Sequence, residues 1–302
     1  MKTFLKNNLV IFFTLFFLFL LFYQNSTFKA CIIKGCFLFF EQVFPSLFPM
    51  FIINDILMNY NFFSIIEKSI NKIFQKIFGF STMASYIFVM SLFSGTPTNA
   101  YLITNLVKEK KINQKDAAII LSYSCFLNPL FLYNMLNAIF HNTHITFKII
   151  LIHYTLNFIT AFFFNKYPYE KRNFFTSNPK PFTKVLANSL KRSTNTFFLI
   201  LGTIIFYFIL CEGISMFLNS PILNCLINGV LETTGGLSKL ILLNINHHLK
   251  EILACFFISF GGLSIHTQIK NIIEEENISY KFFFCSKIIQ AFLATFITII
   301  IS

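Results

Sequence analysis

The chain has 302 residues, of which 55% are hydrophobic and only 12% charged, with a mean hydropathy of +0.67. A soluble domain carries about twice that share of charged residues, so the composition excludes an ordinary soluble domain and indicates a membrane protein. The net charge of +12 would suit nucleic-acid binding, but the lysines and arginines lie between apolar stretches, as loop charges of membrane proteins do. We therefore expect a lipid bilayer as the main partner and no nucleic acid.

The residues that usually carry catalysis or metal binding form no recognisable pattern. The seven cysteines contain no CxxC pair and lie mostly inside apolar runs, which favours buried thiols over disulfides or metal ligands. His247 and His248 have no second cluster that would complete a metal site. The sequence contains no GxSxG, no HExxH, no phosphate-binding loop and no convincing pair of catalytic carboxylates. We expect no enzyme activity, no cofactor and no metal.

The N-terminal segment predicts a membrane helix. Lys2 and Lys6 precede the apolar run Leu9–Phe22, as in a signal peptide, but no small-residue cleavage site follows in Tyr23–Lys29. Residues 1–29 are therefore expected to form an uncleaved membrane helix and a short loop, with the N-terminus in the cytoplasm.

The next apolar stretch, Ala30–Tyr60, predicts a span that is interrupted by prolines. Pro45 and Pro49 are four residues apart, so they fall on one helix face and free two backbone carbonyls. In lipid those carbonyls need partners or a cavity. A simple kink is the favoured interpretation, and a kink that faces a solute path is the alternative.

A short apolar run then predicts an element that enters the membrane without crossing it. Asn61–Phe80 has the spacing of an amphipathic helix lying in the interface. Met83–Phe93 follows with about 11 residues, roughly 16 Å as a helix, against a core of about 30 Å. Gly95 and Pro97 break this run, and Ala100–Val107 continues it. We expect a re-entrant hairpin, which requires protein or water to cover its irregular tip.

The following segments predict two spans and a linker. Asp116–Phe140 is a full-length apolar run that is broken at Asn128-Pro129, and Ile145–Phe164 spans back. Residues 166–192 are strongly basic and contain three prolines, which indicates a cytoplasmic linker.

The last third of the chain repeats this organisation. Thr194–Leu218 predicts a span, and Pro221–Lys250 is a mixed segment. Glu251–Phe260 is too short to cross, and Gly261-Gly262 breaks it, which predicts a second re-entrant hairpin. Tyr280–Ile301 predicts the final span.

An internal repeat relates the two predicted hairpins. Residues 94–116 align without gaps on residues 260–282, with six identities in the 21 positions from Gly95 to Lys115. The first copy ends in four lysines and the second in three glutamates, so the positive-inside rule places the two ends on opposite sides. The prediction is an all-α polytopic membrane protein with about six transmembrane helices and two re-entrant hairpins in an inverted-topology repeat. Secondary transporters have this design.

Several short motifs resemble those of the YlbJ-type sporulation integral membrane proteins, which contain the nucleoside-recognition gate domain. The matching stretches, from about residue 30 to the C-terminus, are Phe44-Pro45-Ser46-Leu47-Phe48-Pro49, Ser94-Gly95-Thr96-Pro97, Asn128-Pro129-Leu130-Phe131, Leu231-Glu232-Thr233 and Phe260-Gly261-Gly262-Leu263-Ser264-Ile265-His266. Two positions depart from the family motif, because Thr96 replaces an aromatic residue and Asn99 replaces a glycine.

The resemblance implies a role in endospore formation. It implies a transporter that moves a small anionic solute, dipicolinic acid, across the outer forespore membrane, and hence a multi-pass protein of the mother-cell or outer forespore membrane. It also implies one gate-like repeat over residues 30–165, with a connecting span, and another over 193–302. The gate domain is similar to concentrative nucleoside transporters, so a nucleoside-type transporter is one alternative. A non-transporting membrane scaffold for spore assembly is the other.

An anionic solute needs hydrogen-bond donors, and the predicted breaks supply candidates. The candidate substrate-binding residues are Ser94, Gly95, Thr96, Pro97, Asn99, Asn128, Pro129, Gly261, Gly262, Ser264 and His266. Glu232 and Glu212 are candidates for coupling to a cation or proton. For each residue a structural role stays open: the hydroxyls bond their own helix, Asn128 satisfies a carbonyl freed by the proline, and the glutamates lie at the interface. Assembly as a homo-oligomer also stays open.

Overall fold

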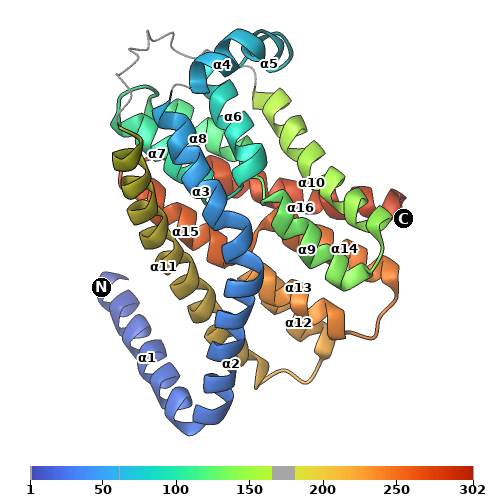
Figure 1. The fold of residues 1–302 in the computed structure, drawn as a ribbon. Coiled ribbons are helices and arrows are strands. Elements are labelled where there is room, and N and C mark those ends of the chain that lie inside the picture. The colour runs from blue at the N-terminus through green and yellow to red at the C-terminus, as the bar shows by residue number, and fades with distance from the viewer. Residues whose placement is uncertain (1, 61, 165–180, 302) are drawn as a thin grey trace.

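The computed structural model describes residues 2–60, 62–164 and 181–301, and their regular structure is entirely helical (Figure 1). Within these ranges, five helical stretches are long and apolar enough to cross a membrane: Asn25–Asn59, Thr143–Phe163, Phe182–Ser215, His247–Glu274 and Lys281–Ile301. A sixth is reached if the bent pair Asn71–Phe78 and Thr82–Ser94 counts as one span. The predicted all-α polytopic membrane fold is confirmed.

The N-terminal region consists of two long helices with almost no loop between them. Helix α1 covers Lys2–Tyr23 and α2 covers Asn25–Leu38, so the predicted loop up to Lys29 is wrong and only Gln24 separates them. The chain continues through the π-helix η1, Phe39–Val43, into α3, Phe44–Asn59. The π-helix ends two residues before Pro45, as expected where a missing backbone donor disturbs the hydrogen-bond ladder.

The predicted amphipathic segment forms two short helices, α4 (Phe62–Ser69) and α5 (Asn71–Phe78). Gly79 ends α5 with a φ of +64°, a left-handed conformation that glycine adopts without strain. The Ser81 hydroxyl accepts a hydrogen bond from the Ala84 backbone and begins the next helix, which turns by 101° from α5. This right angle suits a surface helix that leads into a membrane helix.

The first half continues with α6 (Thr82–Ser94), α7 (Thr98–Lys108), α8 (Gln114–Tyr123), α9 (Pro129–Phe140) and α10 (Thr143–Phe163). Figure 1 shows α7 turning back from the lower end of α6 toward the side on which α6 begins, as the predicted hairpin requires. Helices α8 and α9 are separated by residues 124–128 without regular structure. The predicted break in this span is therefore a whole unwound segment rather than a proline kink.

The second half begins with α11, Phe182–Ser215. This helix starts well before the predicted span at Thr194, so Lys184, Lys191 and Arg192 lie on a helix rather than in the predicted linker. The remainder of that linker, residues 166–180, lies outside the described residues. The basic residues suggested a loop. Lysine and arginine are also good helix formers, so they can continue a membrane helix beyond the bilayer.

A hairpin that the sequence did not predict follows α11. Helices α12 (Pro221–Leu231) and α13 (Thr233–Leu242) are joined at Glu232 alone and pack closely together. A Cβ on Gly236 would lie 2.2 Å from the Cα of Gly229, so the two glycines allow this contact between backbones. The segment that was predicted as mixed is thus a second helical hairpin.

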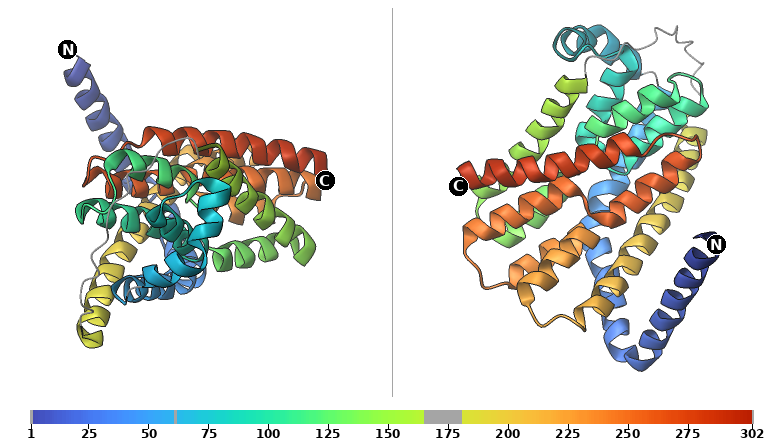
Figure 2. Two further views of the ribbon diagram at one scale, coloured as in Figure 1. Left: turned by 90° about the horizontal axis from the view of Figure 1, so that it is seen from above. Right: turned by 180° about the vertical axis from the view of Figure 1, so that it is seen from behind.

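The predicted hairpin around Gly261-Gly262 is wrong. Helices α14 (His247–Phe260) and α15 (Gly262–Glu274) follow one another as a single interrupted span of 28 residues. At 1.5 Å per residue this stretch is about 42 Å long, enough to cross the membrane. The back view in Figure 2 shows α14 and α15 in sequence beside the final helix, α16 (Lys281–Ile301).

The predicted inverted relation between residues 94–116 and 260–282 is also wrong. The side chain of Gln114 donates a 2.8 Å hydrogen bond to the carbonyl of Glu276, so the lysine-rich and glutamate-rich ends lie on the same side. Ser286 bonds the carbonyl of Ser122 at 2.9 Å, and the two helices run in the same direction. The end with three glutamates was predicted on the opposite side because it has few lysines. Acidic residues contribute little to membrane orientation, so this end carried no strong signal for either side.

The two halves nevertheless contain the same elements in the same order. Each begins with a long helix, α3 or α11, and these two pack against each other. Each then has a hairpin, α6–α7 or α12–α13, an interrupted span, α8–α9 or α14–α15, and a closing helix, α10 or α16. The contacts are reciprocal, since α7 packs on α15 and α13 packs on α9. Because α8 runs parallel to α16 and α16 returns along α14, the interrupted spans run in opposite directions.

Candidate functional site

Four irregular segments meet at the centre of the molecule. We call Gly95–Pro97 and Glu232 the first and second tips, and residues 124–128 and Gly261 the first and second breaks. A Cβ on Gly95 would lie 2.5 Å from the Asn128 nitrogen, and a Cβ on Gly262 would lie 2.9 Å from the Thr233 nitrogen. Each tip therefore contacts the break of its own half, and glycine makes both contacts sterically feasible.

Both tips, the first break and the part of α15 that follows the second break line one cavity of about 40 Å³, which we call the central cavity. Its polar lining residues are Thr96, Asn128, Glu232, Thr234, Ser264 and Gln268. Its apolar lining comes from Pro97, Leu127 and Phe131, from Val43 and Leu47 near the π-helix, from Ile200 and Ile204 of α11, and from Ile265. The predicted residues Thr96, Pro97, Asn128 and Ser264 thus come together with Glu232.

Glu232 is the acidic side chain of the central cavity. It is buried, with a relative exposure of 2%, and its carboxylate accepts a 2.5 Å hydrogen bond from the Gly235 backbone at the start of α13. A carboxylate is stabilised by a helix N-terminus, which explains how this group tolerates burial. A buried ionisable group in a membrane protein is a candidate for function. Glu212, the second predicted coupling residue, lines a different cavity.

Gln268 and Thr234 belong to the cavity but were missed. The amide of Gln268 donates to the Thr203 hydroxyl of α11 at 2.7 Å and to the Ser264 hydroxyl at 3.3 Å. It therefore fixes α15 to the long helix beside the cavity. Gln268 lies four residues after Ser264, so both occupy one helix face, and this spacing was a signal available in the sequence.

Asn128 is fully occupied by structural hydrogen bonds. Its amide oxygen accepts from Leu130 at 2.9 Å and Phe131 at 3.1 Å, which caps α9 at Pro129, its first residue. Its amide nitrogen donates to the carbonyls of Phe93 at 3.0 Å and Ser46 at 3.3 Å. An asparagine amide offers two donors and two acceptor positions, so none is left for a solute. Asn128 fixes the first break between α3 and α6.

Two other predicted residues flank the first tip and do not line the cavity. The Ser94 hydroxyl donates to the Met90 carbonyl of its own helix at 2.8 Å. The Asn99 amide donates to the Ser124 carbonyl at 3.1 Å and to the Cys125 sulfur at 3.2 Å, which ties α7 to the first break. Both side chains stabilise the irregular backbone and do not line the cavity.

His266 is held in an aromatic cluster outside the central cavity. One ring nitrogen lies 2.5 Å from the Tyr280 hydroxyl and the other 2.9 Å from the Phe260 carbonyl. The ring stacks on Phe260, with centroids 4.8 Å apart. Both nitrogens are engaged by protein, so His266 supports the second break and the turn before α16. Gly261 and Gly262 supply the backbone of that break, with φ of +88° and +65°.

Lys287 is buried and was not among the predicted site residues. Its ammonium group donates to the Cys125 carbonyl at 2.8 Å and to the Gln290 side chain at 3.1 Å. An unwound segment leaves backbone carbonyls without helical partners, which is costly in a membrane unless another group satisfies them. Lys287 supplies such a group to the first break. A lysine within an otherwise apolar final span was the available signal.

The fold and the site define a multi-pass helical membrane protein whose interrupted elements meet around one cavity. Among curated proteins the chain is similar to the sporulation integral membrane protein YlbJ of Bacillus subtilis (strain 168). The two are 22% identical over 301 residues, an alignment that covers 86% of this chain and 74% of that protein. This match confirms the resemblance to the YlbJ-type family and supports a membrane role in sporulation. No family model matches the chain, and no solved structure matches it.

Proposed function

We propose that the protein is a transporter that moves a small anionic solute, dipicolinic acid, across the outer forespore membrane during sporulation. The observation that carries the proposal is the convergence of two hairpin tips and two interrupted spans on one cavity that buried residues line. Irregular backbone inside a bilayer is tolerated only where protein or water covers it, and transporters place their substrate sites at such interruptions. A scaffold that needs no solute path would have no use for this arrangement.

The relation between the halves supports movement by alternating access. The hairpins α6–α7 and α12–α13 are each followed by an interrupted span, and these spans run in opposite directions. In transporters built from inverted repeats, one half rocks against the other around a fixed site. The reciprocal packing of α7 on α15 and of α13 on α9 provides two matching surfaces for such a movement.

The central cavity is too small for the proposed solute. A cavity of about 40 Å³ has room for a few water molecules but not for an aromatic dicarboxylate. Binding therefore requires the tips to separate. We assign the coupling role to Glu232, because a charged carboxylate in this cavity would repel an anion unless it carries a proton or binds a cation.

Ligand stabilisation of the purified protein tests the proposal. A solute that binds only the folded state at 100 times its Kd adds about 2.7 kcal/mol of stability. Dipicolinate is expected to raise the melting temperature, and nucleosides and other small anions are not. The substitution Ile200→Phe narrows the central cavity and should abolish this shift, whereas Ile289→Phe, at an exposed position on α16, should preserve it. A shift with nucleosides instead would replace the proposed substrate, and equal shifts in both variants would remove the central cavity from the site.

A further inference from the structure

Helix α11 borders three cavities in succession along its length. The first cavity is lined by Arg192 and Thr196, the central cavity by Ile200 and Ile204, and a third cavity by Phe208 and Glu212. These six residues follow one another at intervals of four, so each lies beside the next in a row that winds gradually around the helix.

The α2–α3 segment borders the same three cavities in the reverse order. Phe51, Asn54 and Asp55 line the first cavity, Val43 and Leu47 the central cavity, and Cys31 and Lys34 the third. Since α2 and α3 pack along α11, the cavities lie in series in the groove between these helices.

The length of this groove matches a membrane. From Arg192 to Glu212 the helix rises by about 30 Å, which is the thickness of a typical hydrocarbon core. We propose that the groove between α2–α3 and α11 is the path by which an anionic solute crosses the membrane, and that the Asp55–Arg192 ion pair closes one end of it. This inference rests on the proposed transport function and adds the route and the gate.

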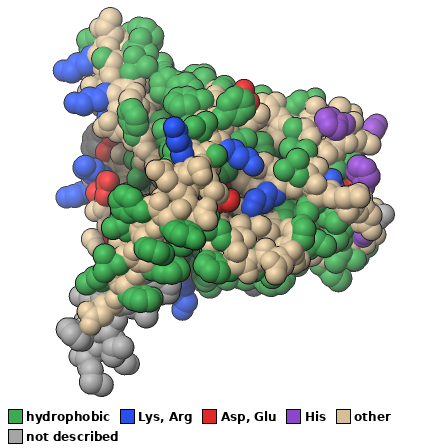
Figure 3. Space-filling view, turned by 90° about the horizontal axis from the view of Figure 1, so that it is seen from below, with side chains coloured by type: hydrophobic (Ala, Val, Ile, Leu, Met, Phe, Trp, Pro, Cys, Tyr) green, Lys and Arg blue, Asp and Glu red, His purple; other side chains and the backbone are tan. Residues whose placement is uncertain are grey.

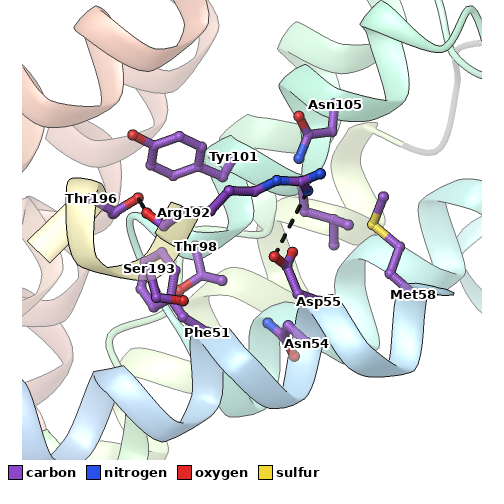
Figure 4. Close-up of a pocket in the computed structure, with 11 residues that line it drawn as sticks. Phe51, Asn54, Asp55, Met58, Thr98, Tyr101, Asn105, Arg192, Ser193 and Thr196 are labelled. Carbon is purple, nitrogen blue, oxygen red and sulfur yellow. Dashed lines mark hydrogen bonds and ion pairs between the residues drawn. The ribbon is translucent and has the colours of Figure 1, made fainter. Parts of the chain in front are cut away.

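The first cavity has the features of a closed end. A carboxylate oxygen of Asp55 on α3 lies 3.7 Å from the guanidinium of Arg192 on α11, and Figure 4 shows this pair spanning the space between the two helices. The cavity behind it measures about 40 Å³. The amide nitrogen of Asn54 and the hydroxyl of Thr98, both buried, have no hydrogen-bond partner there. Buried polar groups normally have partners, so these two are available to a solute or to water.

The third cavity has the features of an open entrance for anions. Its volume is about 240 Å³, and Lys34, Lys239 and Glu212 line it. Two lysines against one glutamate leave a positive balance that raises the local concentration of anions. The ammonium group of Lys239 donates a 2.8 Å hydrogen bond to the Asn224 side chain, which fixes its position beside the cavity that Lys239 lines. The face seen from below in Figure 3 carries basic side chains next to acidic ones among apolar residues. The chemistry fits a small organic carboxylate.

The path is tested by single cysteines in a full-length background without native cysteines. Thr196, Ile200, Ile204 and Phe208 are replaced one at a time, and Phe198→Cys and Phe206→Cys serve as controls because these side chains are exposed on the outer surface of α11. A charged, membrane-impermeant thiol reagent is expected to modify the four path positions, fastest at Phe208, and to leave both controls unmodified. Absence of reaction at Ile200, Ile204 and Phe208, or equal reaction at the controls, would overturn the path.

The gate is tested in the Thr196→Cys protein. Arg192→Gln and Asp55→Asn each remove the ion pair and should raise the modification rate at Thr196 several-fold from the Arg192 side. The exchanged pair, Asp55→Arg with Arg192→Asp, should return the rate toward its original value. Unchanged rates in both single variants would overturn the gate. These measurements need no solute. Labelling along the path without uptake of solute would therefore contradict only the transport function. Uptake of solute without labelling along the path would contradict only the route.

Discussion

At the scale of single residues, two glycines decide whether tips and breaks can meet. Gly95 has a φ of +70° and leaves no room for a Cβ beside Asn128. Gly262 has a φ of +65° and would place a Cβ 2.8 Å from the Thr233 hydroxyl oxygen. The sequence predicted a break at both glycines. It did not predict the residues that each glycine contacts, because these residues lie far away in the chain.

We expect Gly95→Ala to destabilise the protein by roughly 2–5 kcal/mol. A left-handed conformation costs a non-glycine residue about 1–2 kcal/mol, and overpacking adds about 1–3 kcal/mol. Gly202→Ala is the matched control, because a Cβ there meets nothing within 4 Å and alanine favours a helix. Thermal unfolding in detergent measures both variants. Equal melting temperatures would contradict the close contact at the first tip.

We expect Asn128→Ala to lower the amount of folded protein in the membrane rather than the activity of each molecule. The change removes four hydrogen bonds and leaves the carbonyls of Phe93 and Ser46 without this donor. Losing a buried partner typically costs about 1–3 kcal/mol per unsatisfied group. Transport normalised to inserted protein is the measurement. A normal protein level with strongly reduced normalised transport would show that Asn128 binds the solute directly.

At the scale of elements, the internal repeat paired segments that are helices in the structure, but the inverted orientation predicted for them was wrong. The alignment of residues 94–116 with 260–282 pairs α7 with α15 and the start of α8 with the start of α16. Amphipathic helices joined by small residues resemble one another in sequence whichever way they face the membrane, so the alignment carried no orientation. The hairpin α12–α13 escaped prediction because its two apolar runs are short and its tip is the single residue Glu232. Gly229 and Gly236, which allow the two helices of this hairpin to touch, were the clearest sign of it in the sequence.

The corrected arrangement makes a direct topological prediction. Cysteines introduced at Lys111 and Glu275 should react with an impermeant reagent from the same side, since Gln114 and Glu276 are hydrogen-bonded. A cysteine at Ser220, at the start of α12 beyond the far end of α11, should react from the opposite side. Reaction of Lys111→Cys and Glu275→Cys from opposite sides would restore the original repeat and contradict the fold described above.

At the scale of the whole molecule, composition and hydropathy predicted the membrane class, and short motifs predicted the YlbJ-type family. The central cavity was predicted in part: Thr96, Asn128 and Ser264 were expected together, but Gln268 and the contribution of α11 were not. Ile200 and Ile204 look like ordinary membrane residues, and only the packing of α11 against α2–α3 gives them a place beside the cavity.

The proposed role predicts a defect in spores. In the organism that carries this chain, loss of the protein should give spores low in dipicolinate while the mother cell still synthesises it. The Glu232→Gln variant should give the same defect at a normal protein level, since glutamine retains an oxygen that can accept the Gly235 hydrogen bond but cannot titrate. Quantifying dipicolinate separately in spores and mother cells makes the comparison. Normal spore dipicolinate in the deletion strain, with no second carrier, would contradict the role.

Uptake into vesicles that contain only the purified protein and lipid tests the central claim most directly. Labelled dipicolinate should accumulate above the level of protein-free vesicles, and Ile200→Phe and Glu232→Gln should each lower that uptake strongly at equal amounts of inserted, folded protein. The control Ile289→Phe should transport as the unmodified protein does. Uptake no greater than in protein-free vesicles, from protein that is inserted and folded, would contradict the account of the central cavity as a transport site.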